Sequence, residues 1–104
     1  MISFIKKILG IKEINYPELM ERKAVIIDVR TPQEYKQGHV KNSINIPLSD
    51  IGRSIKRIKQ KNKPIITCCR SGARSGNAAG TLKSAGIEVY NGGSWNSVQN
   101  ALRN

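Results

Sequence analysis

The chain has 104 residues, enough for one domain with its own core and too few for two. Its longest apolar run has four residues, against the roughly 20 that a membrane-spanning helix needs, so we expect no such helix. Eighteen Lys and Arg against seven Asp and Glu give a formal net charge of +11, which predicts anionic partners or, equally, nothing more than a lysine-rich surface.

Residues 1–12 mix basic and apolar side chains but lack the uninterrupted hydrophobic stretch of a signal peptide. We treat them as an extension that packs on the domain, frays or lies on a membrane surface, and we expect the domain to cover residues 13–104. A first helix is predicted from Asn15, with Pro17 in its first turn. Residues 24–27 are an apolar run, which is typical of a buried parallel strand.

A second helix is predicted after Thr31, because Pro32 suits the first helical position and Glu34 lies where a capping box needs it. Residues 43–46 alternate polar and apolar side chains, which indicates a short strand. Ser49 is expected to cap the next helix. The apolar stripe of that helix consists of Ile51, Ile55 and Ile58.

Residues 64–68 form another strand-like run, and a helix of small residues is predicted to start near residue 74. Gly86 is well placed to end that helix in the left-handed conformation. Residues 87–90 indicate a last strand, and Ser94 can cap a final helix. Short apolar strands that alternate with helices predict an α/β fold with a parallel sheet.

The most informative segment is the loop between the strand at residues 64–68 and the next helix. It reads Cys69-Arg70-Ser71-Gly72-Ala73-Arg74-Ser75. A cysteine just past a strand end lies where open α/β sheets place their ligands. The helix N-terminus and the two arginines favour a thiolate over a thiol. Cys69 is therefore a candidate nucleophile in a small anion-binding loop, the alternative being a buried structural cysteine.

The two cysteines, Cys68 and Cys69, are adjacent and the chain has one histidine. Adjacent cysteines do not make a disulfide framework, and this set is too small for a zinc site, so we expect no bound metal. The pattern suits a reducing compartment, and we expect a cytoplasmic protein. Cys68 should be structural and point away from the loop, although a vicinal disulfide with Cys69 is the alternative.

Four stretches of the sequence match one family. They are Ile27-Asp28-Val29-Arg30 with Glu34-Tyr35, Gly38-His39-Val40 through Asn45-Ile46-Pro47, the loop from Cys69 to Ser75, and Tyr90-Asn91-Gly92-Gly93 with Trp95. In this order and spacing, the chain resembles the single-domain rhodanese-like sulfurtransferases from about Glu13 to Leu102. The resemblance implies a rhodanese-like five-stranded parallel sheet with helices on both faces, and no cofactor.

The resemblance also implies an activity. Sulfane sulfur would pass from thiosulfate or a persulfide donor to Cys69, and from the Cys69 persulfide to a thiol or cyanide. The substrate-binding residues would be Arg70, Ser71, Gly72, Ala73, Arg74 and Ser75. The alternative within this family is a sulfur-carrier or binding module that serves a partner protein.

Phosphatases share this fold, and Cys68 with Arg74 fits their Cys-x5-Arg spacing. Two residues count against that register. Thr67 stands before Cys68, where phosphatases usually have His. Phosphatases also tend to have Gly three positions after the cysteine, and Gly72 lies three positions after Cys69 rather than after Cys68. The tighter loop counted from Cys69 suits a sulfur atom, and a phosphatase or arsenate reductase is kept as the less favoured alternative.

Asp28 and Arg30 follow the first buried strand and should lie at the same sheet edge as the loop. We expect Asp28 to support the loop by accepting hydrogen bonds and Arg30 to pair with Glu34, with neither residue catalytic. His39 is expected to be structural, because a preformed thiolate needs no base. Trp95 is expected to pack in the core.

Between residues 50 and 74 there are eight basic residues and one acid. This stretch is a solvated helix face, a funnel for a small anionic donor such as thiosulfate, or a docking surface for an acidic sulfur-relay protein. Nucleic acid is not expected, because no aromatic side chains interleave the basic ones to stack on bases.

Overall fold

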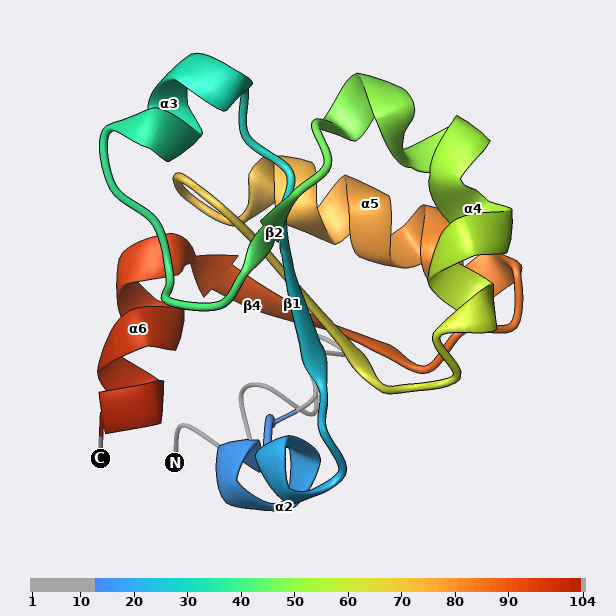
Figure 1. Cartoon of the computed structure of the whole chain (residues 1–104), viewed down its shortest axis with the longest axis horizontal. Coiled ribbons are helices and arrows are strands. Elements are labelled where there is room, and N and C mark those ends of the chain that lie inside the picture. The colour runs from blue at the N-terminus through green and yellow to red at the C-terminus, as the bar shows by residue number, and fades with distance from the viewer. Residues whose placement is uncertain (1–12, 104) are drawn as a thin grey trace.

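The computed structural model describes residues 13–103 (Figure 1), so the extension expected at residues 1–12 lies outside the described residues. The described part contains one parallel sheet with the strand order β2-β1-β3-β4. Its strands are β1 (Val25–Asp28), β2 (Ile44–Asn45), β3 (Ile65–Cys69) and β4 (Val89–Ser94). The five-stranded sheet is therefore wrong for the described residues, which form four strands, because the stretch before β1 is helical.

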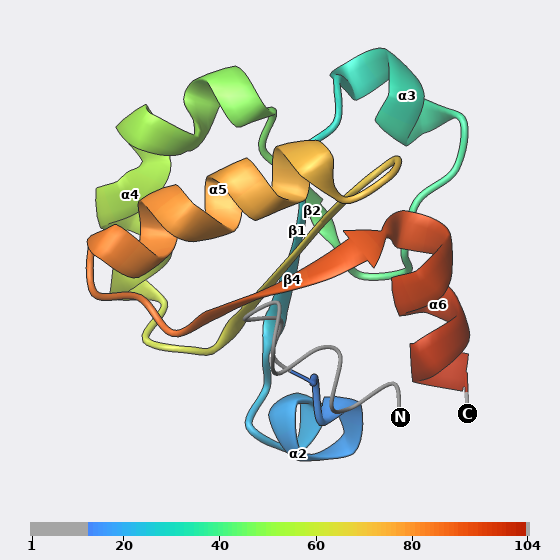
Figure 2. The same cartoon turned by 180° about the vertical axis from the view of Figure 1, so that it is seen from behind.

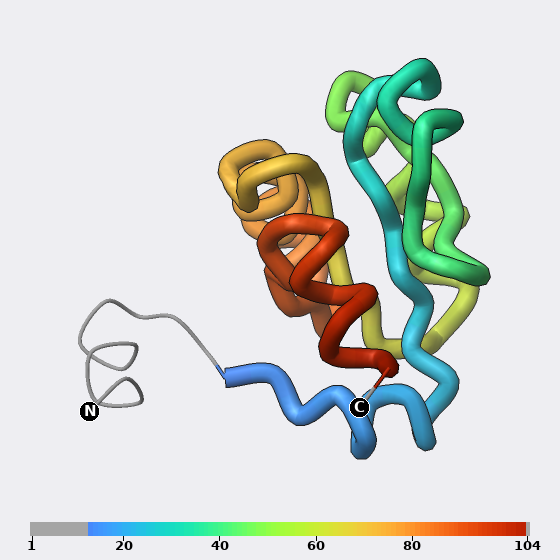
Figure 3. Tube along the Cα trace, turned by 90° about the vertical axis from the view of Figure 1, so that its left-hand side faces the viewer, coloured from blue at the N-terminus to red at the C-terminus, as the bar shows by residue number. Residues whose placement is uncertain are grey.

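Helices cover both faces of the sheet, as expected (Figures 1 and 2). They are α2 (Tyr16–Glu21), α3 (Pro32–Lys36), the 3-10 helix η1 (Leu48–Asp50), α4 (Ile51–Gln60), α5 (Ala73–Ser84) and α6 (Trp95–Arg103). Apolar residues of α4 and α5 pack on one face, and those of α2 and α6 on the other. In Figures 1 and 3, α2 lies where β1 begins and α3 lies at the opposite end, where β1 ends.

Most of the expected helix boundaries are confirmed. The Asn15 side chain accepts a hydrogen bond at the start of α2, and Thr31 with Glu34 forms the capping box of α3. The Ser94 hydroxyl accepts from the Ser97 N–H at 3.1 Å, which caps α6. The expected Ser49 cap is wrong. Residues 48–50 form η1 instead, so α4 begins at Ile51.

The strand β4 is longer than its apolar run predicts and contains a bulge. Thr67 pairs with Asn91 and Cys69 pairs with Ser94, so β4 has one residue more than β3 over this interval. A Cβ at Gly92 would lie 2.9 Å from the Thr67 carbonyl oxygen, and Gly93 has φ of +80°. Two glycines therefore let β4 continue past residue 90 and bring Asn91 beside the loop that follows β3.

Candidate active site

Cys69 lies at the carboxyl end of β3, where the chain enters the loop to α5. Successive side chains of a strand point to opposite faces. Cys69 accordingly packs with the α4 and α5 cluster, and Cys68 packs with the α2 and α6 cluster. Cys69 is only 1% exposed. Any molecule that reacts with Cys69 must therefore reach a sulfur enclosed by the loop.

The Cys69 sulfur is surrounded by hydrogen-bond donors from the loop and the start of α5. The Gly72 N–H donates to Sγ at 3.0 Å, and the Ser75 N–H donates at 3.4 Å. The Ser75 hydroxyl lies 3.3 Å from the same sulfur. This arrangement can stabilise negative charge on a thiolate or on a persulfide that replaces it.

Two opposing effects set the pKa of Cys69. Burial is the largest and raises it, but hydrogen bonds from the Ser75 hydroxyl and from the Ser75, Gly72 and Ser71 N–H groups together lower it below the ordinary value of 9.0. The lowered pKa predicted from the sequence is therefore confirmed. The principal cause is hydrogen bonding by the loop rather than the two arginines.

Gly72 shapes the loop. It has φ of +105° and precedes the first residue of α5, Ala73, so the helix starts slightly earlier than predicted. A Cβ at Gly72 would lie 3.4 Å from the Cα of Gly93 on β4. The left-handed backbone aims the Gly72 N–H at the sulfur, and a side chain there would be strained.

Asn91 is a site residue that sequence reasoning did not single out. Its Oδ1 accepts from the Ser75 hydroxyl at 2.7 Å and from the Gly93 N–H at 3.0 Å. Its Nδ2 donates to the Gly72 carbonyl oxygen at 3.2 Å. Asn91 thus ties the β4 bulge to the middle and to the end of the loop from Cys69 to Ser75. The available signal was the segment Asn91-Gly92-Gly93, in which two glycines follow a polar residue.

Arg74 is held by a carboxylate from α3. Its two Nη atoms donate to the Oε atoms of Glu34 at 2.8 and 3.0 Å. The expected pairing of Arg30 with the Glu34 carboxylate is therefore wrong, because Arg30 reaches only the Glu34 backbone oxygen, at 3.3 Å. Glu34 offsets part of the Arg74 charge, while Arg70 is exposed on the loop.

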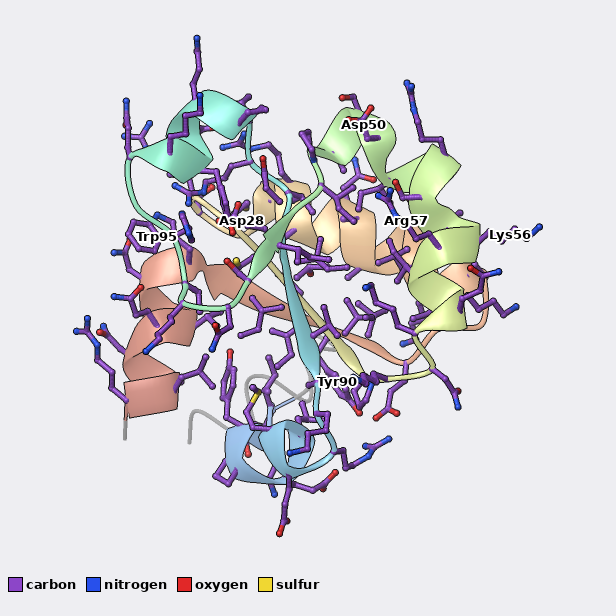
Figure 4. All side chains as sticks on the ribbon, in the orientation of Figure 1. Asp28, Asp50, Lys56, Arg57, Tyr90 and Trp95 are labelled. Carbon is purple, nitrogen blue, oxygen red and sulfur yellow. The ribbon has the colours of Figure 1, made fainter. Side chains whose placement is uncertain are left out.

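Asp28 and Arg30 form a buried ion pair beside the site. The guanidinium of Arg30 donates to the Asp28 carboxylate at 2.8 to 3.0 Å and to the Gly38 carbonyl oxygen at 2.7 Å. Its Cζ lies 4.9 Å from the ring centroid of Trp95 (Figure 4). The expected support of the Cys69 loop by Asp28 is therefore wrong, because its carboxylate accepts from Arg30 and supports the turn after β1 instead. Trp95 combines packing with a cation–π contact.

Cys68 lies in a different environment. Its side chain is fully buried, and burial together with the Asp28 charge raises its pKa to about 12. Both cysteines are free thiols. The Cys-x5-Arg register would start on this thiol, which faces the α2 and α6 side rather than the donors of the loop. The geometry therefore disfavours a phosphatase that uses Cys68.

His39 is held by α3. Its ring stacks on Tyr35 with 3.7 Å between centroids, and its Nδ1 lies 2.8 Å from the Tyr35 carbonyl oxygen. These contacts agree with a structural role. Among residues 13–103, no cluster of His, Cys, Asp and Glu could hold a metal ion, and no helix is long and apolar enough to cross a membrane.

Comparisons with known proteins point to one family. A family model described as a rhodanese-like domain matches residues 15–101. The uncharacterized protein YqhL of Bacillus subtilis is 44% identical over 71 residues, which cover 67% of this chain and 56% of YqhL. The thiosulfate sulfurtransferase PspE of Escherichia coli is 39% identical over 69 residues, covering 64% of this chain and 66% of PspE. The chain thus spans little more than half of the first relative and about two thirds of the second.

A further relative and a solved structure complete the comparison. The putative sulfur carrier protein YrkF of Bacillus subtilis is 35% identical over 63 residues, covering 61% of this chain and 34% of YrkF. A structure described as a rhodanese with anions from E. coli matches with a TM-score of 0.65 and 36% identity, covering 71% of this chain and 89% of that chain.

Proposed function

Because the chain belongs to the rhodanese-like domain family, we propose that it is a sulfurtransferase that carries sulfane sulfur as a persulfide on Cys69. The observation that supports this proposal best is the set of donors around one sulfur atom. The Gly72 and Ser75 N–H groups donate to Sγ at 3.0 and 3.4 Å, and the Ser75 hydroxyl lies 3.3 Å from it. A thiolate held in this way is a nucleophile that needs no base.

The proposed reaction has two displacement steps, with thiosulfate as the donor. The Cys69 thiolate attacks the outer sulfur of thiosulfate, the S–S bond breaks, and sulfite leaves with the bonding electron pair. An acceptor thiolate or cyanide then attacks the outer sulfur of the Cys69 persulfide, and the Cys69 thiolate is released. The loop from Arg70 to Ser75 stabilises the negative charge at each stage.

The test is direct. Protein incubated with thiosulfate and cyanide should release thiocyanate, and mass spectrometry of the protein incubated with thiosulfate alone should find one added sulfur atom on the peptide that contains Cys69. Cys69→Ser should lose both signals. Full activity in Cys69→Ser would rule out the proposed nucleophile.

A sulfur-carrier role is the second candidate, and the likeness to YrkF favours it. A carrier in the cytoplasm would take sulfur from one protein and pass it to another, and it would use thiosulfate poorly. Sulfur loading of Cys69 from a protein persulfide, with little thiocyanate formed from thiosulfate, would distinguish the carrier from the thiosulfate enzyme.

A further inference from the structure

The charges of the domain are distributed unevenly along the chain. Between Asp50 and Glu88 the sequence has nine basic residues and no acid. They are Arg53, Lys56, Arg57, Lys59, Lys61, Lys63, Arg70, Arg74 and Lys83. Three of the seven acids lie instead before β1, in or beside α2, at the far end of the sheet. The exposed side of α4 is therefore strongly positive.

A pocket at the start of α4 contains two of these basic residues, Arg53 and Arg57. It is lined by Asn45, Ile46, Pro47, Asp50, Arg53, Ser54 and Arg57. The Asn45 Nδ2 donates to the backbone oxygens of Asp28 and Arg30 at 2.9 and 3.0 Å, which places the pocket at the carboxyl edge of the sheet. Ile46 and Ile51 belong to the same apolar cluster as Cys69. The pocket and the Cys69 sulfur therefore share one edge and one face of the sheet.

The pocket brings two arginines together with one carboxylate, that of Asp50. Arg53 is 78% exposed and lies 3.4 Å from the Asp50 carboxylate, and an Arg57 Nη donates to the Ser54 hydroxyl at 3.3 Å. Like charges four residues apart destabilise a helix. Figure 4 shows Lys56 extending from the same helix away from the sheet. A carboxylate from outside would gain a guanidinium partner here and relieve that repulsion.

The chemistry of the surface favours one kind of partner. The stretch from residue 51 to residue 87 has no aromatic side chain on which nucleic acid bases could stack. The apolar residues of α4 pack inward, with Ile51 and Ile58 buried, so the helix offers no apolar face to a lipid surface. Paired guanidiniums match carboxylates in geometry and charge.

We propose that Arg53, Lys56 and Arg57 form a docking surface for an acidic protein that donates persulfide sulfur to Cys69. This rests on the proposed sulfurtransferase function. The Cys69 thiolate attacks the outer sulfur of the donor's cysteine persulfide, the donor's S–S bond breaks, and the donor leaves as a thiolate. Carboxylates that flank the donor cysteine occupy the pocket at the start of α4 and hold the persulfide over the loop.

Two synthetic peptides of equal length, each with a cysteine persulfide, test the proposal. One has aspartates beside the cysteine and the other has asparagines at the same positions. Wild-type protein should accept sulfur from the acidic peptide about tenfold faster, and added salt should remove the difference. Arg53→Glu with Arg57→Glu should lose this preference and keep thiosulfate turnover within about twofold.

The matched control is Lys61→Glu with Lys63→Glu, which makes the same change in net charge past the other end of α4. Equal slowing by both double variants would mean that net charge alone acts, and equal rates for the two peptides would likewise overturn the docking surface. Single-stranded RNA that inhibits through Arg53 and Arg57 more strongly than a persulfide-free acidic peptide would point to nucleic acid instead. Sulfur uptake from neither thiosulfate nor any peptide would refute the proposed function as well.

Discussion

Cys69 meets hydrogen-bond donors on the α4 and α5 side of the sheet, whereas Cys68 meets apolar side chains and the Asp28 carboxylate on the α2 and α6 side. The pKa of Cys69 is lowered, and that of Cys68 is raised to about 12. Both thiols are buried and belong to consecutive residues. Burial raises the pKa of both thiols, and only around Cys69 do hydrogen bonds outweigh it.

The difference originates in the chain that follows β3. The loop turns back over the α5 side of the sheet, and the N–H groups at the start of α5 have no partners within the helix itself. Some of them point at Cys69. On the α2 and α6 side, Cys68 lies instead near the Asp28–Arg30 ion pair. The negative charge of Asp28 disfavours a Cys68 thiolate.

Substitution of the two cysteines should give the largest contrast. We expect Cys69→Ser to lower sulfur transfer by about 10³-fold or more, because the nucleophile is lost. Cys68→Ala should keep transfer and lower stability by about 1 kcal/mol through the small cavity it leaves. Thiocyanate release and thermal unfolding measure the two effects. Comparable loss of activity in both variants would contradict the separation of roles.

Alkylation of the native protein should separate the two thiols next. Iodoacetamide should modify Cys69 with a pH midpoint below 9.0, and at neutral pH it should react more than about tenfold faster than Cys68. Peptide mass spectrometry after a short exposure identifies the modified residue. Cys68 should react only once the protein is unfolded, and faster native labelling of Cys68 would reverse the comparison.

Asn91→Asp should make Cys69 less reactive at neutral pH and so more similar to Cys68. A carboxylate at this position would hold the Ser75 hydroxyl more strongly, lose the hydrogen bond to the Gly72 carbonyl oxygen and add negative charge near the sulfur, which together raise the pKa of Cys69. Alkylation at neutral pH should slow by about tenfold. Asn100→Asp, an exposed substitution on α6 with the same charge change, is the control. An unchanged pH profile in Asn91→Asp would show that Asn91 does not influence the thiolate.

Glu34→Gln should have the smallest effect, a small loss of stability, because it removes the carboxylate that pairs with Arg74. Hydrogen bonds from Arg74 hold the pKa of Glu34 at about 2, below its ordinary 4.5. A carboxylate with a depressed pKa adds stability above its unfolded pKa, and that stability is lost as the pH falls towards its folded pKa. The variant should therefore unfold a few degrees below the wild type at pH 7, and the gap should close between pH 4.5 and 2. A gap that persists at pH 2 would mean that another contact is lost.

Local sequence patterns predicted the elements and the environment of the Cys69 sulfur well. The alternation of β3 placed Cys68 and Cys69 on opposite faces, and Gly72 at a loop before a helix indicated N–H groups around the sulfur. The patterns failed where a residue could adopt either of two local structures. Ser49 looked like a cap, but the turn after Pro47 became η1.

Local patterns did not predict side-chain contacts between different helices and strands. Glu34 was expected to pair with Arg30, four residues away, and instead holds Arg74, 40 residues away. Asn91 supports Ser75 from 16 residues away only because β4 lies beside β3, where Asn91 pairs with Thr67. Strand alternation and a helix start follow from a few consecutive residues, and they already indicated Cys69 as the candidate nucleophile. The contacts that support Cys69 depend on how β4, α3 and α5 pack against one another. These elements are far apart in the sequence, so no local pattern predicts their packing.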